Sequence, residues 1–273
     1  MIHNSLFSLA GKKIAFSGAT GVLGTSMSLY LAKEGAEVLI LGRTPNKVND
    51  LVQEIVDAGG KAFGYICDVT NEASIQEVYT AIEKEHGYID ILINAAGGNM
   101  PGAVITPDKT LQDLELISLR KVMDLNYLGT AIPSKILFPL MLKNGKGNII
   151  NISSMAASRP MTRVMGYASA KAAIDNLTKF LSVELCTKHG PEFRVNAIAP
   201  GFFLTEQNSA LLTEADGSLT GRGNQIINHT PMNRFGKPED LNGALHWLCA
   251  EASAFVTGTI VAVDGGFGAY SGV

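Results

Sequence analysis

The stretch from Lys12 to Arg43 reads KKIAFSGATGVLGTSMSLYLAKEGAEVLILGR. Two short apolar runs, at residues 12–17 and 37–42, flank a longer segment whose apolar residues recur at helical spacing. A glycine-rich turn joins the first run to that segment. A strand, a helix and a second strand in this order predict a right-handed βαβ unit with parallel strands.

The same alternation continues along the rest of the chain. Apolar runs typical of strands recur at residues 61–66, 89–94, 147–153, 194–199 and 259–264. Helical patterns separate most of the strands, at Leu23 to Glu34, Lys47 to Asp57, Glu72 to His86, Thr110 to Leu142, Val164 to Lys188 and Pro238 to Ala250. We therefore expect residues 1–273 to form a single doubly wound (Rossmann) α/β domain, with a seven-stranded, mainly parallel sheet and helices on both faces.

The composition argues against several classes of protein. Of the 273 residues 46% are hydrophobic and 17% charged, and the net charge is −3, which disfavours a disordered chain and binding to nucleic acid or an anionic membrane. Cys67, Cys186 and Cys249 form no C-x-x-C pair, and the five histidines show no metal-site spacing, so we expect reduced thiols and no metal. No secretory signal pattern and no apolar run of membrane length is visible, which predicts a cytoplasmic protein.

A long polar stretch, residues 201–237, separates the sixth strand from the last helix. It contains turn signals at Asp216-Gly217 and at residues 221–223. Long stretches of this kind are either lids or disordered. Because ligands of parallel sheets bind at the carboxyl ends of the strands, we predict a substrate lid.

The turn after the first strand, SGATGVLG at residues 17–24, predicts a nucleotide site. Its glycines let the backbone approach a pyrophosphate, and the helix that follows offers free N–H groups. Later strand ends add Asp68 for an adenine, residues 94–97 for a ribose and Thr205 for a carboxamide, although helix caps and turns explain each one separately. The expected cofactor-binding residues are Gly18, Thr20, Gly21, Val22, Leu23, Arg43, Asp68, Val69, Asn94, Ala95, Ala96, Gly97, Tyr167, Lys171, Pro200, Gly201 and Thr205.

The choice between NAD and NADP depends on the end of the second strand. NAD-binding chains place an Asp or Glu there for the ribose 2′-OH, whereas this chain has Gly42-Arg43. Arg43 favours NADP because a guanidinium pairs with a 2′-phosphate. A solvated loop arginine is the alternative.

Tyr167 and Lys171 stand four residues apart in a helical pattern, downstream of Ser154. The phenol and the ammonium therefore share one helix face. Lowering a phenol pKa from about 10 to about 7 takes about 4 kcal/mol, which an ammonium about 4 Å away supplies at an effective dielectric of about 20. Ser154, on the loop after a strand, is placed to hydrogen-bond a substrate oxygen. We predict a proton-transfer site for a carbonyl or an alcohol, although Tyr/Lys pairs at this spacing also arise by chance.

In combination, Tyr167-x-x-x-Lys171, Ser154, the NAAG at residues 94–97 and Pro200-Gly201 resemble the short-chain dehydrogenase/reductase family over nearly the whole chain. The resemblance implies an NAD(P)-dependent dehydrogenase or reductase that forms a homotetramer or a homodimer. It also implies the role of each catalytic residue. Tyr167 would be the acid/base, and Lys171 would lower its pKa and bind the nicotinamide ribose.

The other two catalytic roles follow from the same resemblance. Ser154 would polarise the carbonyl, and Asn126 in DLNYLG, which matches the family's fourth catalytic position, would hold a water that relays protons through Lys171. The turn departs from the family's T-G-x-x-x-G-x-G, because Ser17 replaces Thr and Val22 stands where the middle glycine belongs. We therefore expect the pyrophosphate to be placed differently.

The segments NAAGGN at residues 94–99 and FVTGTIVAVDGGFGAYSGV at residues 255–273 are similar to the D-mannonate oxidoreductase (fructuronate reductase) branch. This implies interconversion of D-fructuronate and D-mannonate. That branch is NAD-linked, so the choice between NAD and NADP stays open. A gluconate 5-dehydrogenase or another sugar ketone reductase, and a non-catalytic nucleotide-binding sensor, are the alternatives.

A hexuronate ketone carries a carboxylate and several hydroxyls, so its pocket needs a cation and polar groups. Arg159 or Arg163, between Ser154 and Tyr167, is the predicted carboxylate clamp, with a surface salt bridge as the alternative for each. Asn99, Gln207 and Asn208 are expected to bond hydroxyls, and Arg222 and His229 are second choices. The apolar ending at residues 259–273 predicts packing either against another subunit or over its own.

Overall fold

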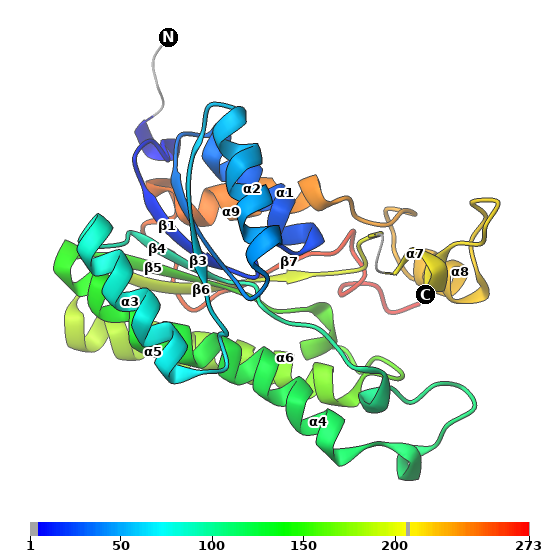
Figure 1. Cartoon of the computed structure of the whole chain (residues 1–273). Coiled ribbons are helices and arrows are strands. Elements are labelled where there is room, and N and C mark those ends of the chain that lie inside the picture. The colour runs from blue at the N-terminus through cyan, green and yellow to red at the C-terminus, as the bar shows by residue number, and fades with distance from the viewer. Residues whose placement is uncertain (1–4, 206–207, 273) are drawn as a thin grey trace.

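Seven strands form one sheet in the order β3–β2–β1–β4–β5–β6–β7, and every neighbouring pair is parallel (Figure 1). The strands are β1 Lys13–Ser17, β2 Glu37–Gly42, β3 Lys61–Ile66, β4 Ile91–Asn94, β5 Gly147–Ile152, β6 Phe193–Pro200 and β7 Ile260–Val263. This computed structural model describes residues 5–205 and 208–272. The predicted doubly wound α/β fold with a seven-stranded parallel sheet is confirmed.

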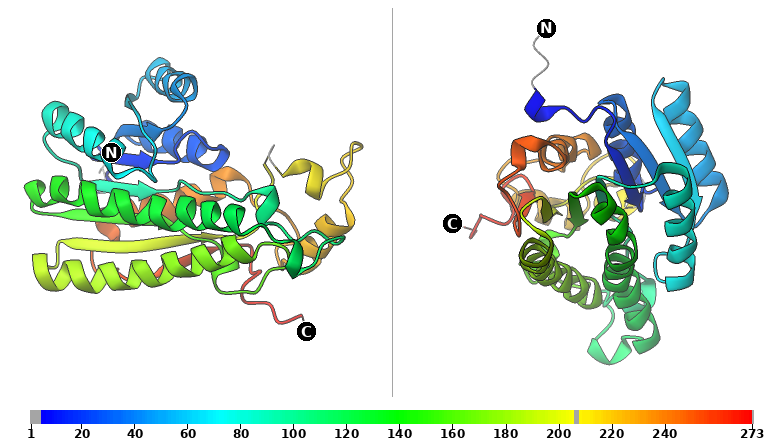
Figure 2. Two further views of the ribbon diagram at one scale, coloured as in Figure 1. Left: turned by 60° about the horizontal axis from the view of Figure 1, so that its bottom comes forward. Right: turned by 90° about the vertical axis from the view of Figure 1, so that its left-hand side faces the viewer.

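Helices cover both faces of the sheet, as Figures 1 and 2 show. One face carries α1 Val22–Lys33, α2 Pro45–Asp57 and α9 Asn242–Cys249, and the other carries α3 Glu72–His86, α5 Gly129–Asn144 and α6 Met165–His189. Strand residues alternate between the two layers: Ile14 and Phe16 pack into the first, and Ala15 into the second. Both faces of the inner strands are therefore buried, which explains why these strands read as continuous apolar runs.

The helical segment expected from Thr110 to Leu142 is divided into parts. A 3-10 turn at Leu111–Asp113 closes on itself, because the Thr110 amide and hydroxyl both donate to the Asp113 carboxylate. The helix α4, Leu116–Met123, then leads through a π-helical turn at Asp124–Leu128 into α5. The widened turn coincides with the Asn126 side chain, which donates to the Val122 carbonyl that a regular helix would use for a backbone bond. The prediction that this segment is helical was correct, but the predicted start at Thr110 and the predicted single continuous helix were wrong.

The stretch at residues 201–237 holds two short helices, α7 Ser209–Leu212 and α8 Gly221–Asn228, which the sequence reading treated as irregular. Both lie beyond the carboxyl ends of the strands, in yellow in Figure 1. Thr220 caps α8 by accepting from the Gly223 amide. A lid at this place remains a proposal.

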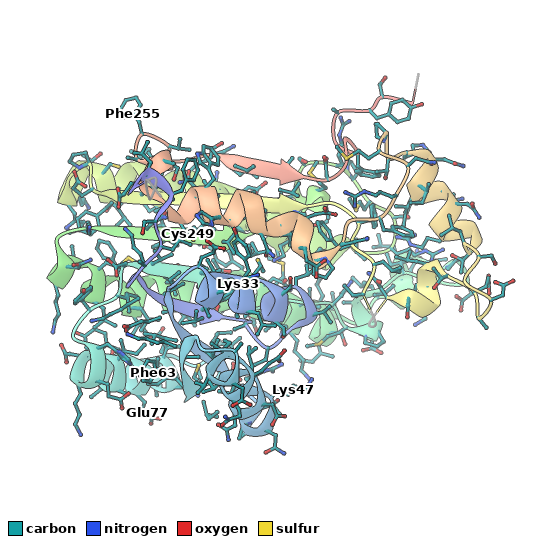
Figure 3. All side chains as sticks on the ribbon, turned by 90° about the horizontal axis from the view of Figure 1, so that it is seen from above. Lys33, Lys47, Phe63, Glu77, Cys249 and Phe255 are labelled. Atoms are coloured by element: carbon teal, nitrogen blue, oxygen red, sulfur yellow. The ribbon has the colours of Figure 1, made fainter. Side chains whose placement is uncertain are left out.

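Side chains fill the layers on both sides of the sheet (Figure 3). All three cysteines are free; Cys67 and Cys249 are buried, whereas Phe255 protrudes into solvent. Across residues 5–205 and 208–272, no helix combines the length and apolar character needed to cross a bilayer.

Candidate active site

A crevice of about 340 Å³ opens where β1 and β4 end side by side, which is the point at which strand order reverses in a doubly wound sheet. Gly18 forms its floor with a φ of 76°. A Cβ at Gly18 would lie 2.5 Å from the Ala96 amide nitrogen. Only glycine therefore lets the first turn sit against the end of β4.

A second cavity of about 260 Å³ continues this crevice toward the end of β2. The two cavities share Gly18, Gly21, Ala95 and Gly97 in their walls. Thr20, Arg43, Thr44, Lys47 and Val69 line the second cavity. Together the cavities make a bent cleft across the switch point, lined by small residues at its middle and cations at its outer end. This shape and donor set fit a dinucleotide.

Most of the expected cofactor-binding residues line this cleft. Val22, Leu23, Tyr167, Lys171, Pro200, Gly201 and Thr205 lie in the first cavity, and Ala96 lies in the second. Sequence reasoning missed Thr44 and Lys47. The signal was available, because Lys47 follows Arg43 by four residues in the first turn of α2.

Asp68 and Asn94 are not among the residues that line either cavity. Asp68 accepts hydrogen bonds from the Thr70 amide at 2.9 Å and the Thr70 hydroxyl at 2.7 Å, which help to keep the pKa of the carboxyl low against the effect of burial. Asn94 is buried beneath the cleft, where its Nδ2 donates to Ser134 Oγ and Asn151 Oδ1, both at 3.0 Å. Both Thr70 bonds use Oδ1 of Asp68, so its contact with an adenine stays a prediction, whereas the Asn94 side chain braces β4, β5 and α5.

Ser154 and Tyr167 meet at the inner end of the first cavity. Their side chains are hydrogen-bonded to each other. The Ser154 oxygen also accepts from the Ala156 amide at 3.1 Å, so its one hydroxyl proton is available for the hydrogen bond to the Tyr167 oxygen. Burial raises the pKa of the Tyr167 phenol, and the hydrogen bond with Ser154 works against that rise.

Lys171 lies one turn after Tyr167 on α6, as expected, but it does not lower the phenol pKa in this structure. Its Nζ donates to the Ile152 carbonyl at 2.7 Å and lies 5.5 Å from the centre of the Tyr167 ring. Burial lowers the pKa of the Lys171 ammonium to about 8, and Asp175 opposes that shift. The expected depression of the tyrosine pKa is therefore wrong for this state, because the cation is turned toward a backbone carbonyl.

Asn126 is fully buried within the π-helical turn. It lies against Gly97, since a Cβ there would be 2.6 Å from Asn126 Oδ1 and 3.3 Å from Lys171 Nζ. Asn126, Lys171, Tyr167 and Ser154 thus gather around one end of the cleft. The sequence predicted these four residues, but the π-helical turn left no recognisable pattern in it.

A third cavity of about 250 Å³ adjoins Ser154 and Tyr167 on the side of the polar stretch. Its other lining residues are Asn99, Ala156, Met161, Val164, Gly201, Phe202 and Arg222. We call it the substrate pocket. Asn99 thus lies where it was expected, and its side chain accepts from the Met100 amide at 2.9 Å.

The other expected substrate contacts lie elsewhere. Arg159 donates through Nε, at 3.0 Å, and Nη2 to the Gly268 carbonyl, so its guanidinium fastens the C-terminal segment rather than lining the pocket. Asn208 holds the loop before α7, donating to the Phe203 carbonyl and accepting from the Thr205 amide, both at 2.8 Å. Gln207 falls outside the described residues. Arg222, a second choice from the sequence, is the arginine that lines the substrate pocket.

The C-terminal segment folds over its own subunit. The Phe267 and Phe202 rings pack edge to face at 5.2 Å, and Asp264 accepts from the Gly266 and Gly268 amides. Through Arg159 it reaches the loop that carries Ser154. The expected packing of the ending over its own chain is seen, and packing against another subunit stays a prediction.

A family model described as enoyl-(acyl carrier protein) reductase matches residues 18–268, nearly the whole chain. The chain belongs to the short-chain dehydrogenase/reductase family. It is accordingly an NAD(P)-dependent oxidoreductase that acts on CH–OH groups. The expectation drawn from the sequence motifs is confirmed at this level.

The relatives include proteins that act on sugar acids. An uncharacterized oxidoreductase, UxuB, of Bacillus subtilis is 44% identical over 97% of this chain and 98% of its own. A solved structure from Haemophilus influenzae, described as a "putative D-Mannonate oxidoreductase" with bound NAD, has a TM-score of 0.91 and 42% identity over 97% of this chain and 98% of its own. A gluconate 5-dehydrogenase of Burkholderia cenocepacia, in complex with NADP and tartrate, has a TM-score of 0.84 and 29% identity over 97% of this chain and 98% of its own.

Proposed function

We propose that this short-chain dehydrogenase/reductase interconverts a sugar acid and its keto form, with D-fructuronate and D-mannonate as the substrate pair. The observation that carries the proposal is a cation, Arg222, in the same pocket as Ser154 and Tyr167. The relative that carries NAD and the name of a D-mannonate oxidoreductase supports the choice of substrate. The gluconate 5-dehydrogenase bound to tartrate, a hydroxy acid, supports an acid substrate in general.

The residues around the pocket account for the proton side of the reaction. Because its pKa is raised, Tyr167 is neutral at pH 7 and is in the form that donates a proton to a ketone oxygen. With substrate bound, the Ser154 hydroxyl can donate to the same ketone oxygen instead of to Tyr167 and stabilise the charge that develops on it. In these forms the two side chains are suited to the proton-transfer step of ketone reduction.

Lys171 and Asn126 support this proton transfer from the far side of Tyr167. Both lie against Gly97 in the wall of the cleft, where Lys171 can reach the ribose of a nicotinamide nucleotide. When bound, the reduced cofactor supplies the hydride. Asn126 holds the backbone at Gly98 in place beside the cleft.

A gluconate 5-dehydrogenase is the second candidate. The Gluconobacter oxydans enzyme of that name is 32% identical over 97% of this chain and 98% of its own, and 5-ketogluconate would also present a carboxylate to Arg222. A non-catalytic nucleotide-binding sensor is disfavoured, because such a protein needs none of the four groups gathered around Tyr167.

Initial rates with D-fructuronate and 5-ketogluconate, each with NADH and NADPH, test the proposal. Rapid oxidation of either cofactor with D-fructuronate supports it. Activity on 5-ketogluconate alone moves the substrate to the gluconate class.

We further propose that the chain assembles as a homodimer or homotetramer. Phe180 and Val183, neighbours on α6, are 60% and 67% exposed, an unusual position for two large apolar side chains. Sedimentation equilibrium of the wild-type protein and of Val183→Lys checks this. A monomeric wild-type protein would exclude it.

A further inference from the structure

The substrate pocket contains one charged group among mostly apolar walls. Arg222, in the first turn of α8, faces the same cavity as Ser154 and Tyr167. Ala156, Met161, Val164 and Phe202 supply the apolar wall. A half-buried guanidinium in such a place needs a partner, since burial of an unpaired charge is unfavourable.

That partner is not a described residue of the chain. Arg222 makes no ion pair or side-chain hydrogen bond with any residue in 5–205 or 208–272. Its near neighbour is instead a second cation, Arg163, whose charge, together with burial, lowers the pKa of the Arg222 guanidinium. Arg163 likewise has no side-chain partner among those residues. Two adjacent cations without a carboxylate between them attract an anion.

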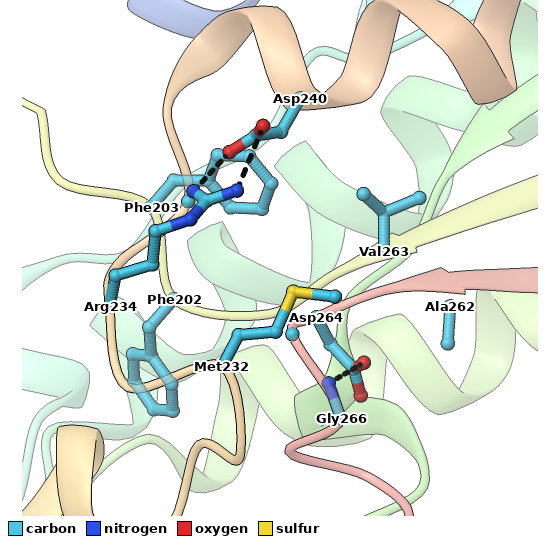
Figure 4. A pocket seen from close by; sticks show the side chains of 11 residues that line it. Phe202, Phe203, Met232, Arg234, Asp240, Ala262, Val263, Asp264 and Gly266 are labelled. Atoms are coloured by element: carbon cyan, nitrogen blue, oxygen red, sulfur yellow. Dashed lines mark hydrogen bonds and ion pairs between the residues drawn. The ribbon is translucent and has the colours of Figure 1, made fainter.

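Other arginines in this part of the fold are satisfied. Figure 4 shows Arg234 in a neighbouring cavity of about 360 Å³, where it pairs with Asp240 at 2.6 and 3.1 Å. Arg159 bonds the Gly268 carbonyl. The charge of Arg234 in the larger cavity is therefore neutralised, whereas Arg222, in the pocket that holds Tyr167, has no such partner among the described residues.

The backbone at Arg163 is also specialised. Its φ of 77° lies in the left-handed region, where a side chain with a Cβ is strained. The conformation lets the Arg163 carbonyl accept from the Ile105 amide at 3.0 Å, just before α6 begins. The turn thus fixes the backbone position of Arg163, two residues before α6 begins.

We propose that Arg222, with Arg163 beside it, is the carboxylate subsite of the substrate pocket. A guanidinium can grip a carboxylate with two parallel hydrogen bonds. The carboxylate would be held at this end of the pocket while Tyr167 and Ser154 hold the ketone oxygen. This inference deepens the proposed function and rests on it for the identity of the acid.

The test compares an acid with its neutral counterpart. D-Fructuronate is D-fructose with one terminal CH₂OH oxidised to a carboxylate, so a comparison of the two substrates isolates the effect of that charge. In Arg222→Gln, kcat/KM for D-fructuronate should fall about 10- to 100-fold, mainly through KM, with little change for D-fructose. Arg222→Lys should recover part of the loss, and Arg163→Gln should show a smaller loss in the same direction.

Arg120→Gln is the matched control, because Arg120 is exposed on α4, lines none of the cavities above and has no partner among the described residues. Equal losses on acid and neutral substrate in Arg222→Gln would overturn the inference, as would unchanged kinetics on both. Calorimetry of D-mannonate and D-mannitol binding to the cofactor-saturated enzyme separates the two proposals. If Arg222→Gln abolishes the binding of D-mannonate, the subsite is supported even when the wild-type enzyme fails to reduce D-fructuronate. If the wild-type enzyme reduces D-fructuronate and the variant binds D-mannonate as well as the wild type does, the proposed function is retained and the subsite is refuted.

Discussion

Asn126 and Gly98 bond each other twice: the Asn126 amide donates to the Gly98 carbonyl at 2.8 Å, and its Oδ1 accepts from the Gly98 amide at 3.2 Å. A third bond, to the Val122 carbonyl at 2.8 Å, anchors the same side chain in the π-helical turn. One buried side chain therefore joins the α4–α5 helical segment to the loop after β4. That loop forms the wall of the cleft beside Lys171.

Asn126→Ala should weaken both folding and catalysis. The substitution leaves buried backbone groups without partners, which costs about 1–3 kcal/mol of unfolding free energy. Loosening of Gly98 should also lower kcat. Urea unfolding and initial rates check both effects, with the exposed Asn176→Ala as control. A variant with the stability and kcat of the wild type would show that the double bond to Gly98 is dispensable.

Tyr167→Phe should lose turnover and keep the cofactor. The phenol is the proton donor to the ketone, and such groups contribute about 10²- to 10⁴-fold to rate. The ring remains in the wall of the cleft, so nucleotide affinity should change little. Fluorescence titration with the reduced cofactor measures affinity, and stopped-flow absorbance at the nicotinamide band measures turnover. Substantial steady-state reduction by this variant is incompatible with the assigned role.

Asp175 should control the pH dependence of the reaction through Lys171. Asp175 accepts a hydrogen bond from Ser153; burial lowers the pKa of Lys171 to about 8 against the opposing charge of Asp175. In the wild type, reduction should slow as the pH rises through about 8 and the ammonium loses its proton. Asp175→Asn removes the raising charge and should move that limb of the kcat profile down by about 1 pH unit. An unmoved limb would mean that another group produces it.

The contribution of Lys171 to the free energy of unfolding should rise as the pH increases above about 8, whereas the rate of reduction should fall. The folded-state pKa of Lys171, about 8, lies below the ordinary value of 10.5. Between these values the unfolded chain binds more protons than the folded one, so this group makes folding more favourable as the pH rises. The burial that lowers the pKa of Lys171 therefore opposes folding at neutral pH.

The sequence predicted the sheet, and it brought the proposed catalytic residues together, because both have short-range patterns. Continuous apolar runs marked strands buried on two faces, and Tyr167 and Lys171 are linked by the helix period alone. The spacing did not predict which way the Lys171 side chain points. Its Nζ donates to the Ile152 carbonyl at the end of β5, and the residues around Tyr167 and Lys171 in the sequence carry no information about that contact.

The substrate side was harder to predict for a related reason. Arg159 is closer in sequence to the catalytic residues than Arg222, yet the C-terminal segment engages it from 109 positions away. Arg222 reaches the pocket only because α8 folds back over the strand ends. Asn94 sits in a recognisable motif, but the buried partners Ser134 and Asn151 turn its side chain away from the cleft. In all three cases, contacts between residues far apart in the sequence determine where the side chain lies.

The structure also gives a reason for the missing acidic residue at the end of β2. A Cβ at Gly42 would lie 2.8 Å from Val48 Cγ2, a stiff branched side chain, so an Asp there would not fit without a shift of α2. Exposed Arg43 and Lys47 line the adjoining cavity instead, and Figure 3 marks Lys47 at the start of α2. These cations suit a 2′-phosphate better than a 2′-hydroxyl.

We therefore expect this enzyme to prefer NADPH over NADH, although a relative at 42% identity carries NAD. Arg43→Ala should raise KM for NADPH about 10-fold or more, since it removes a charged hydrogen bond to phosphate, and should leave KM for NADH nearly unchanged. Lys47→Ala should act in the same direction and more weakly, because an ammonium makes a single point contact. Lys33→Ala, in the last turn of α1 and outside the cavity, serves as the control. Two outcomes would contradict this expectation: equal kcat/KM values for NADPH and NADH in the wild type, or equal effects of Arg43→Ala on the two cofactors. Either would mean that Arg43 is a solvated loop residue and that the cations of this cavity do not select the 2′-phosphate.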